Sequence, residues 1–248
     1  VVVRMRFVVA SVLLLTACEA RLGGDTNNRA DDSGLPGDAP GVEPDSAPVC
    51  LKRQVFLSFQ GETLTDGATS DAKQNVASWM QGGVTTATTP PYRAGAANRA
   101  TQIQTIIDAA KARLAPFAID VVTTRPTSGD YMMIVFGGTA ANVGSRFGFV
   151  QELDCGDLVR NDVAWVDDNF NAASIPNAIV GSIGFAIGLT ATADPAGCMC
   201  SWDNNCTPNT NNCVLQDGIA RDLTANQLCS GAPAIQNEIS DINAAFCN

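Results

Sequence analysis

Apolar residues along this chain gather in short runs, and four of these runs predict β-strands. They span residues 55–59, 118–124, 131–136 and 163–166. The second and third runs are separated by Pro126 and Gly129, which are turn-forming residues. An acidic segment precedes the fourth run and two aspartates follow it. These boundaries predict short strands joined by polar loops.

Apolar residues at helical spacing predict three helices, over residues 72–80, 101–114 and 235–246. The first follows Ser70 or Asp71, either of which can cap it, and it ends at a Gly-Gly pair. The second has the clearest apolar face and stops before Pro116. The third has Pro233 near its start. The predicted elements therefore follow the order strand, helix, strands and helix, and a disulfide-rich tail is expected at the end of the chain.

The segment 169–193 carries no charged residue. Its continuous apolar part runs only from about residue 178 to 189, which suits a buried helix and is too short for a bilayer span. Gly181, Gly184 and Gly188 each cost this helix about 1 kcal/mol relative to alanine. Close packing against the sheet, or a sharp chain exit at Gly188, would account for them.

The first 18 residues have the pattern of an export signal. Arg4 and Arg6 precede an apolar run over 7–15, and Leu-Thr-Ala-Cys18 then resembles the bacterial lipobox, whose cysteine is lipidated. The alternative is an ordinary signal peptide cleaved nearby. The pattern predicts an exported protein held at the cell envelope through a lipid on Cys18, at the outer membrane or cell surface.

Residues 19–49 are rich in Asp, Gly, Pro, Asn and Ser and have almost no large apolar side chain. Such a segment cannot bury enough surface to order itself. Seven acidic residues against two arginines favour an extended, soluble tether. A folded domain is therefore expected to begin near Cys50.

The composition narrows the possible chemistry. The chain has 248 residues, 46% of them hydrophobic, and a net charge of −10, which argues against nucleic acid as a partner. It contains no histidine. Ser-His-Asp triads, Cys-His pairs and histidine-ligated metals are therefore excluded.

Nine cysteines become eight once Cys18 is assigned to lipid. An even number in an exported chain predicts disulfides, here four, and the sequence leaves their pairing open. A zinc cluster of Cys198, Cys200, Cys206 and Cys213 is a weaker alternative, because the spacing lacks paired CxxC knuckles. The eight candidates are Cys50, Cys155, Cys198, Cys200, Cys206, Cys213, Cys229 and Cys247.

Several segments, in this order, resemble the metzincin zinc peptidases, and most closely the matrixin-like proteins of myxobacterial type. They are YMMIVFGG (131–138), LDCGD (153–157), VAWV (163–166), the apolar segment 179–189, Asp-Pro (194–195) and CMC (198–200). The resemblance covers about residues 53–202. It implies an α+β fold, namely an α/β sandwich with a twisted mixed sheet and packed helices, an active-site-type helix and a following Met-turn. The metzincin-like domain is expected to span residues 50–202. The cysteine-rich tail, residues 203–248, lies outside the resemblance and is expected to end in a helix.

The family signature is H-E-x-x-H-x-x-G-x-x-H, with a methionine downstream. Aligning Gly188 with the motif glycine places Gly181, Phe185 and Ala191 at the three histidine positions and Ser182 at the general-base glutamate. Met199 then falls where the Met-turn belongs. Gly181, Phe185 and Ala191 offer no donor atom for a metal, and Ser182 cannot act as a general base.

The resemblance therefore implies a pseudoenzyme, with no catalytic residue and no zinc at the family site. An extended peptide could still bind along the sheet edge beside the helix, since that mode needs no metal. Two alternatives stay open: a structural envelope protein, or an active peptidase with substitute ligands. The substitute ligands would be Asp167, Asp168 and Asp194 with Asp154 or Asp157, and such oxygen ligands favour calcium or magnesium. The acidic loop that also contains Glu152 and Asp162 is expected to be a solvated or calcium-binding rim, and the membrane is expected to be contacted through the lipid alone.

Overall fold

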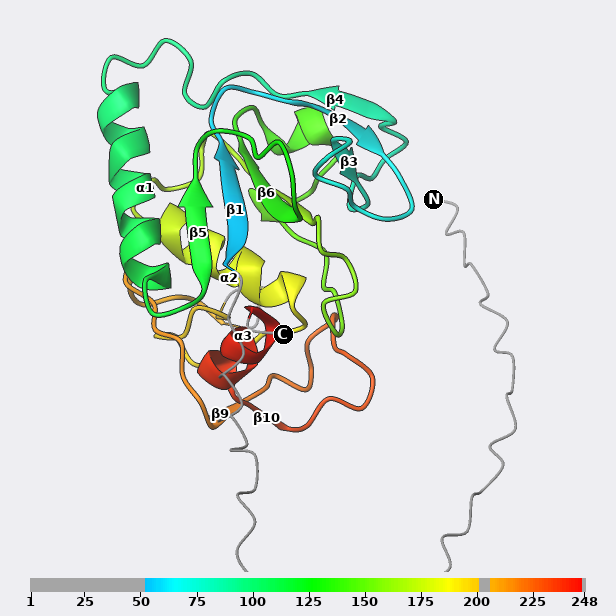
Figure 1. Ribbon diagram of the computed structural model, residues 1–248, viewed down its shortest axis with the longest axis vertical. Helices are drawn as coiled ribbons and strands as arrows, with labels where there is room; N and C mark the ends of the chain where they lie inside the picture. Colours follow the sequence, from blue (N-terminus) through cyan, green and yellow to red (C-terminus); the bar gives the residue numbers. More distant parts are fainter. Residues whose placement is uncertain (1–51, 201–205, 247–248) are drawn as a thin grey trace, which may run out of the picture. The chain divides into compact units, whose positions relative to one another are not determined.

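The fold is described from a computed structural model that covers residues 52–200 and 206–246. Five strands form a mixed sheet in the order β5-β1-β6-β8-β7 (Figure 1). Four of them pair in parallel and β7 pairs antiparallel with β8 at the edge. Their bounds are β1 Arg53–Ser58, β5 Ile119–Val122, β6 Tyr131–Phe136, β7 Phe149–Val150 and β8 Val163–Val166. The expected α+β class and the mixed sheet are confirmed, as are the four predicted strands.

Strand β6 lies at the centre of the sheet, and all six of its residues are buried. Its side chains alternate between two apolar clusters, because successive residues of a strand point to opposite faces. Met132, Ile134 and Phe136 join one cluster. Tyr131, Met133 and Val135 join the other. The sheet therefore separates two cores.

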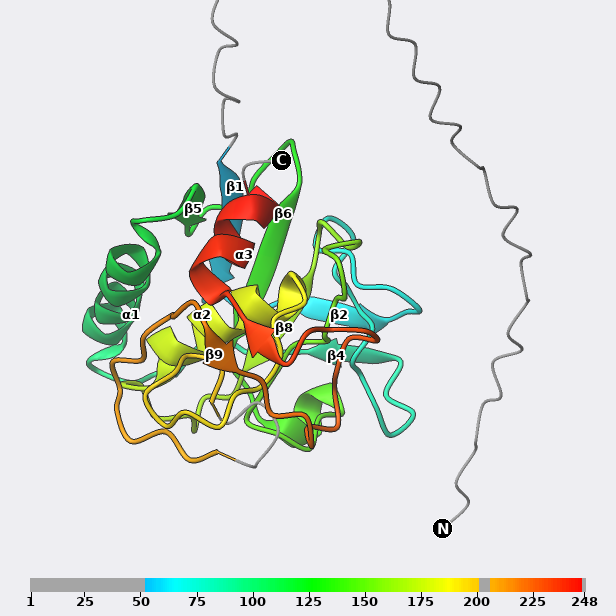
Figure 2. The ribbon, with the colours of Figure 1, turned by 90° about the horizontal axis from the view of Figure 1, so that it is seen from below.

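The first core lies between the sheet and the helices α1 (Arg99–Leu114), α2 (Ile175–Ala186) and α3 (Glu238–Phe246). Figures 1 and 2 show α1 and α2 on the same side of the sheet, and these two helices pack against each other. Helix α1 matches the helix predicted over 101–114. The helix predicted around 178–189 is also present, but it begins three residues earlier, with Pro176 in its first turn, where no amide donor is needed.

The second core is covered by a small sheet of β2 (Thr63–Asp66), β3 (Val76–Ala77) and β4 (Thr86–Thr88). The helix predicted over 72–80 is wrong, because this segment instead supplies β3. Asp71 accepts hydrogen bonds from the Lys73 amide and the Gln74 side chain, and Asn75 has a positive φ of 57°. This local side-chain bonding favours a turn over a helix. Trp79, expected on a helix face, is buried in the second core and donates to the Val163 carbonyl.

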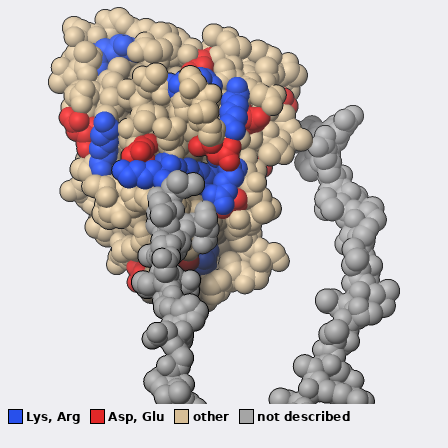
Figure 3. Space-filling model, viewed as in Figure 1, with Lys and Arg blue, Asp and Glu red and all other residues tan. Residues whose placement is uncertain are grey.

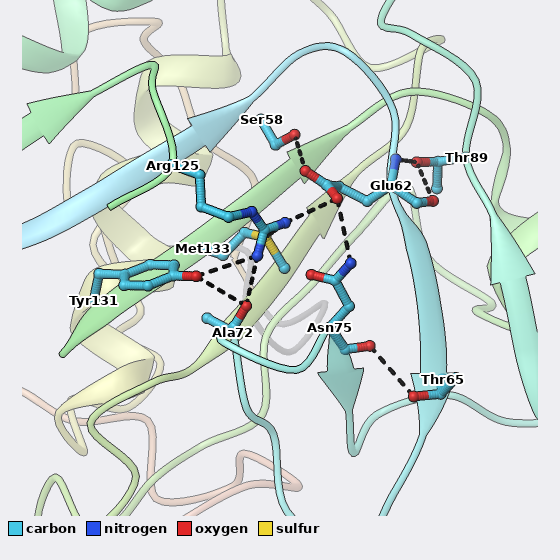
Figure 4. Close-up of polar contacts among 9 residues, drawn as sticks. All are labelled: Ser58, Glu62, Thr65, Ala72, Asn75, Thr89, Arg125, Tyr131 and Met133. Atoms are coloured by element: carbon cyan, nitrogen blue, oxygen red, sulfur yellow. Dashed lines mark hydrogen bonds and ion pairs between the residues drawn. The ribbon is translucent and has the colours of Figure 1, made fainter. Parts of the chain in front are cut away.

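Glu62 connects the small sheet to the main one (Figure 4). Its carboxylate accepts a hydrogen bond from the Ser58 hydroxyl at 2.7 Å and pairs with the Arg125 guanidinium at 2.8 Å. Arg125 also donates to the Ala72 carbonyl and to the hydroxyl of Tyr131. The charges of Glu62 and Arg125 are therefore satisfied by protein groups, and this cluster holds two layers together.

The C-terminal segment differs from the predicted single helix over 235–246. Residues 235–236 form β10 (Ile235–Gln236), which pairs antiparallel with β9 (Ile219–Ala220), and α3 begins only at Glu238. The predicted apolar face is only half buried: Ile242 and Phe246 lie in the core, whereas Ile235 and Ile239 are exposed. A short 3-10 helix, η1 (Ala140–Val143), completes the described elements.

Three disulfides join six of the eight candidate cysteines: Cys155–Cys229, Cys198–Cys213 and Cys200–Cys206. Cys50, Cys247 and the proposed lipid site Cys18 lie outside the described residues, as do the signal and the tether. Within the part of the chain that the structure describes, no helix is long and apolar enough to cross a membrane.

Candidate binding cleft

A cleft of about 1100 Å³ lies beside the edge strand β7. One wall is the segment 145–153, which contains β7. A second wall comes from α2 and the residues before it, and the third comes from segments 208–211 and 226–228 of the tail. The cleft thus joins parts of the chain that are far apart in the sequence.

Aromatic and aliphatic side chains form much of the cleft surface. Phe149 and Phe170 pack edge to face, with ring centroids 5.1 Å apart. Phe185 of α2 is buried and also lines the cleft. At the rim, Phe147 is 53% exposed and Leu228 is 36% exposed. Exposed apolar side chains of this size beside a concavity are typical of a binding surface.

The polar part of the lining is mainly uncharged. It includes the amide side chains of Asn171, Asn209, Asn211, Asn226 and Gln227. Among the described lining residues, only Arg146 and Glu152 carry a charge. The Ser78 hydroxyl donates to the Glu152 carboxylate. The surface is therefore suited to apolar groups and amide-type hydrogen bonds.

Arg113 of α1 fixes the tail wall to the helices. Its guanidinium donates to the side-chain oxygens of Asn177 and Asn212 and to the Asn211 carbonyl. Asn177 in turn donates to the Thr210 carbonyl at 3.1 Å. Partial burial lowers the pKa of Arg113, but the guanidinium stays charged throughout the neutral pH range. This wall is also closed by the Cys198–Cys213 disulfide.

The family alignment places four positions on or just after α2, and all four are buried. Phe185, at the second histidine position, reaches the cleft. Gly181, Ser182 and Ala191 are outside the described cleft lining. Met199 lies against the same helix: a β-carbon placed on Gly184 would be 2.6 Å from its sulfur.

Gly188 ends the helix with a positive φ of 89°. A β-carbon there would lie 3.2 Å from both the Asp154 carbonyl oxygen and the Gly156 amide nitrogen. The Cys155–Cys229 disulfide lies in the same contact, and the chain beyond Gly188 turns away from α2. The sharp exit expected at Gly188 is thus present.

The tail covers the loop that contains Ala191. The Asp222 amide donates to the Ala191 carbonyl, and Gln236 exchanges two hydrogen bonds with the backbone of Thr190. Gln236 also donates to Glu238, which is fully buried. Burial raises the pKa of Glu238 to about 7. A polar network of the tail therefore surrounds the loop that contains Ala191.

Most acidic side chains of the predicted rim are paired with or hydrogen-bonded to nearby protein groups. Asp157 pairs with Arg53 at 2.6 Å and with Arg160 at 3.1 Å, and Asp154 accepts the Val159 amide. Asp167, Asp168 and Asp194 accept backbone amides through their side chains. Asp162 is buried, and one of its carboxylate oxygens accepts no hydrogen bond from the described residues. Within residues 52–200 and 206–246, no three His, Cys, Asp or Glu side chains are grouped so that they could hold a metal ion. Calcium binding at this loop stays a prediction.

Sequence reasoning missed most of the cleft. Some lining residues were singled out for other roles: Phe185 as a vacated ligand position, Glu152 in the acidic loop, and Cys155, Cys198 and Cys200 as disulfide candidates. Neither β7 nor the tail segments were expected to form a cleft. Phe147 and Phe149 alternate with glycine, and this period-two pattern could have marked the edge strand. The tail segments carry no pattern that relates them to α2. The sequence matches no protein-family model, no curated protein and no solved structure.

Proposed function

We propose that this chain is an exported lipoprotein whose metzincin-like domain is catalytically inactive and binds an extended peptide or protein segment at the cell surface. The cleft beside β7 is the observation that carries the proposal. It combines an edge strand, an apolar lining and uncharged hydrogen-bonding groups, which together suit an extended polypeptide.

The residue types at the aligned positions support the loss of activity. Gly181 and Ala191 have no donor atom, and Phe185 fills its position with an aromatic ring. Ser182 is buried and is a poor general base. The disulfides and the tail network around Ala191 stabilise this region without a metal.

Peptide binding can be tested with a displayed library of random linear peptides, selected on the immobilised full-length protein. Enriched peptides are then synthesised with a fluorescent label, and their dissociation constants are measured by anisotropy. The test variant is Phe147→Ser/Leu228→Ser, which removes two exposed apolar side chains from the rim. Its partner control is Leu158→Ser/Leu223→Ser, which removes two exposed apolar side chains outside the described cleft lining.

We expect the rim variant to weaken binding by about tenfold or more, because burying one large apolar side chain contributes about 1.5–3 kcal/mol. The control should bind like the natural protein. Absence of any enriched peptide, or equal weakening by both variants, would overturn the peptide-binding proposal and favour a structural envelope role.

A further inference from the structure

We propose that the bound peptide carries an acidic residue that pairs with Arg146, next to an apolar residue that packs on Phe147. This inference rests on the proposed function and specifies the chemistry of its ligand. The observation that supports it is that Arg146 is the only cation among the described residues that line the cleft.

Arg146 is exposed, and its guanidinium has no hydrogen bond or ion pair with any other residue that the structure describes. Several cations elsewhere form ion pairs. Lys52, Lys73 and Arg160 each pair with an aspartate. On the face that Figure 3 draws, Lys and Arg side chains lie beside Asp and Glu side chains. Among the described residues that line the cleft, Arg146 is thus the one cation, and no described protein group pairs with it.

The second charged group of the cleft does not compensate Arg146. Glu152 accepts a hydrogen bond from the Ser78 hydroxyl and forms no ion pair with Arg146. Among the described residues, Arg146 therefore has no carboxylate within ion-pair distance, although the whole chain has a net charge of −10. An anionic group of the ligand is the complement that this local charge favours.

The neighbour of Arg146 defines the second requirement. Phe147 is 53% exposed and follows Arg146 directly in the cleft wall. An extended peptide that lies along this wall spaces its successive side chains much as the wall spaces Arg146 and Phe147. An acidic and a large apolar residue, adjacent or one apart, would therefore meet both groups.

The test is the same random-peptide selection, carried out in parallel on the natural full-length protein and on two charge variants. Arg146→Glu reverses the cleft charge. Lys111→Glu makes the same change in net charge on an exposed residue of α1 that lies outside the described cleft lining. Lys111 likewise has no hydrogen bond or ion pair among the described residues, which makes it a matched control.

We expect the natural protein and Lys111→Glu to enrich peptides in which Asp or Glu lies next to a large apolar residue. Arg146→Glu should enrich Lys or Arg at that place instead. For one acidic peptide, Arg146→Ala should weaken binding about two- to fivefold at low salt, the range of an exposed ion pair, and less at high salt.

The two proposals fail in different ways. Peptides that bind the rim but show no acidic preference, or the same preference with Arg146→Glu, overturn the Arg146 inference and leave peptide binding intact. Selection that yields no peptide for any variant overturns both.

Discussion

The sulfur of Met199 occupies the space that a side chain at Gly184 would need. A β-carbon on Gly184 would lie 2.6 Å from Met199 Sδ and 3.2 Å from Leu189 Cδ1. Met199 is fully buried, so its sulfur has little room to move. The cost of a glycine inside α2 thus has a packing reason: it lets the methionine approach the helix.

Gly184→Ala is expected to destabilise the protein by about 1–3 kcal/mol. Alanine favours the helix by about 1 kcal/mol, but overpacking a filled core costs more than that gain. Urea denaturation of the natural and variant proteins measures the difference. In the Gly184→Ala/Met199→Ala double variant the two effects should be far from additive, because removing the methionine relieves the clash. Additive effects would contradict the contact.

Gly188→Ala is expected to destabilise the protein by more than Gly218→Ala. Both glycines have positive φ, 89° and 75°, so both substitutions carry the cost of a left-handed conformation, about 1–2 kcal/mol. Only Gly188 also has backbone atoms 3.2 Å from the new β-carbon, whereas Gly218 has open space. Thermal denaturation of the pair separates strain from packing. Equal losses would show that the Asp154–Gly156 contact contributes nothing.

Asp162 predicts a dependence of stability on pH. Its side chain is almost fully buried, and burial, with the nearby Asp154 charge, raises its pKa to about 8. The folded state therefore holds this proton more tightly than the unfolded chain, whose aspartate pKa is 3.8. The stabilisation that protonated Asp162 gives to the folded state is complete when the pH is below the pKa of this aspartate in the unfolded chain. It is lost as the pH rises through about 8.

Asp162→Asn should remove this dependence. The variant is expected to be more stable than the natural protein above about pH 8, by up to a few kcal/mol, and to approach it at acidic pH. Denaturant titrations across that range provide the measurement. Parallel pH profiles for the two proteins would mean that Asp162 does not titrate as described.

Removing the Cys198–Cys213 disulfide should affect both stability and the cleft. The bridge closes a loop with a sequence separation of 15, for which the chain-entropy account gives a loss of about 3 kcal/mol. Because Cys198 lines the cleft and Cys213 follows the wall held by Arg113, Cys198→Ser/Cys213→Ser should also weaken peptide binding. Unchanged affinity under conditions where the variant stays folded would place the ligand away from this wall.

Sequence patterns predicted the secondary-structure elements correctly where nearly all of an element's side chains are buried. Strands 131–136 and 163–166 were placed to the residue because an unbroken apolar run fits a strand buried on both faces. The helix predicted over residues 72–80 is wrong because the positive φ of Asn75 and the side-chain hydrogen bonds of Asp71 favour a turn, despite the helical spacing of the apolar residues. The prediction that the C-terminal helix starts at residue 235 is wrong because Gln236 is hydrogen-bonded to Thr190. This partner lies 46 residues away, and no periodicity in the sequence reveals it.

The candidate site was predictable only where it lies on α2. Phe185 was singled out by its spacing within one apolar helical segment, although as a vacated ligand position and not as part of a cleft. Arg146 and Leu228 acquire their importance from the tertiary contact between the β7 wall and the tail. The Cys155–Cys229 disulfide that links these regions spans 74 residues, and its pairing is one of many that the cysteine count allows.

The zinc content of the purified protein tests the central claim most directly, namely that a metzincin-like site has lost its metal. After equilibrium dialysis against zinc, we expect no stoichiometric metal on the natural chain, and one zinc per chain on the variant Gly181→His/Ser182→Glu/Phe185→His/Ala191→His. Stoichiometric zinc on the natural chain, together with casein cleavage that a chelator abolishes, would contradict the account.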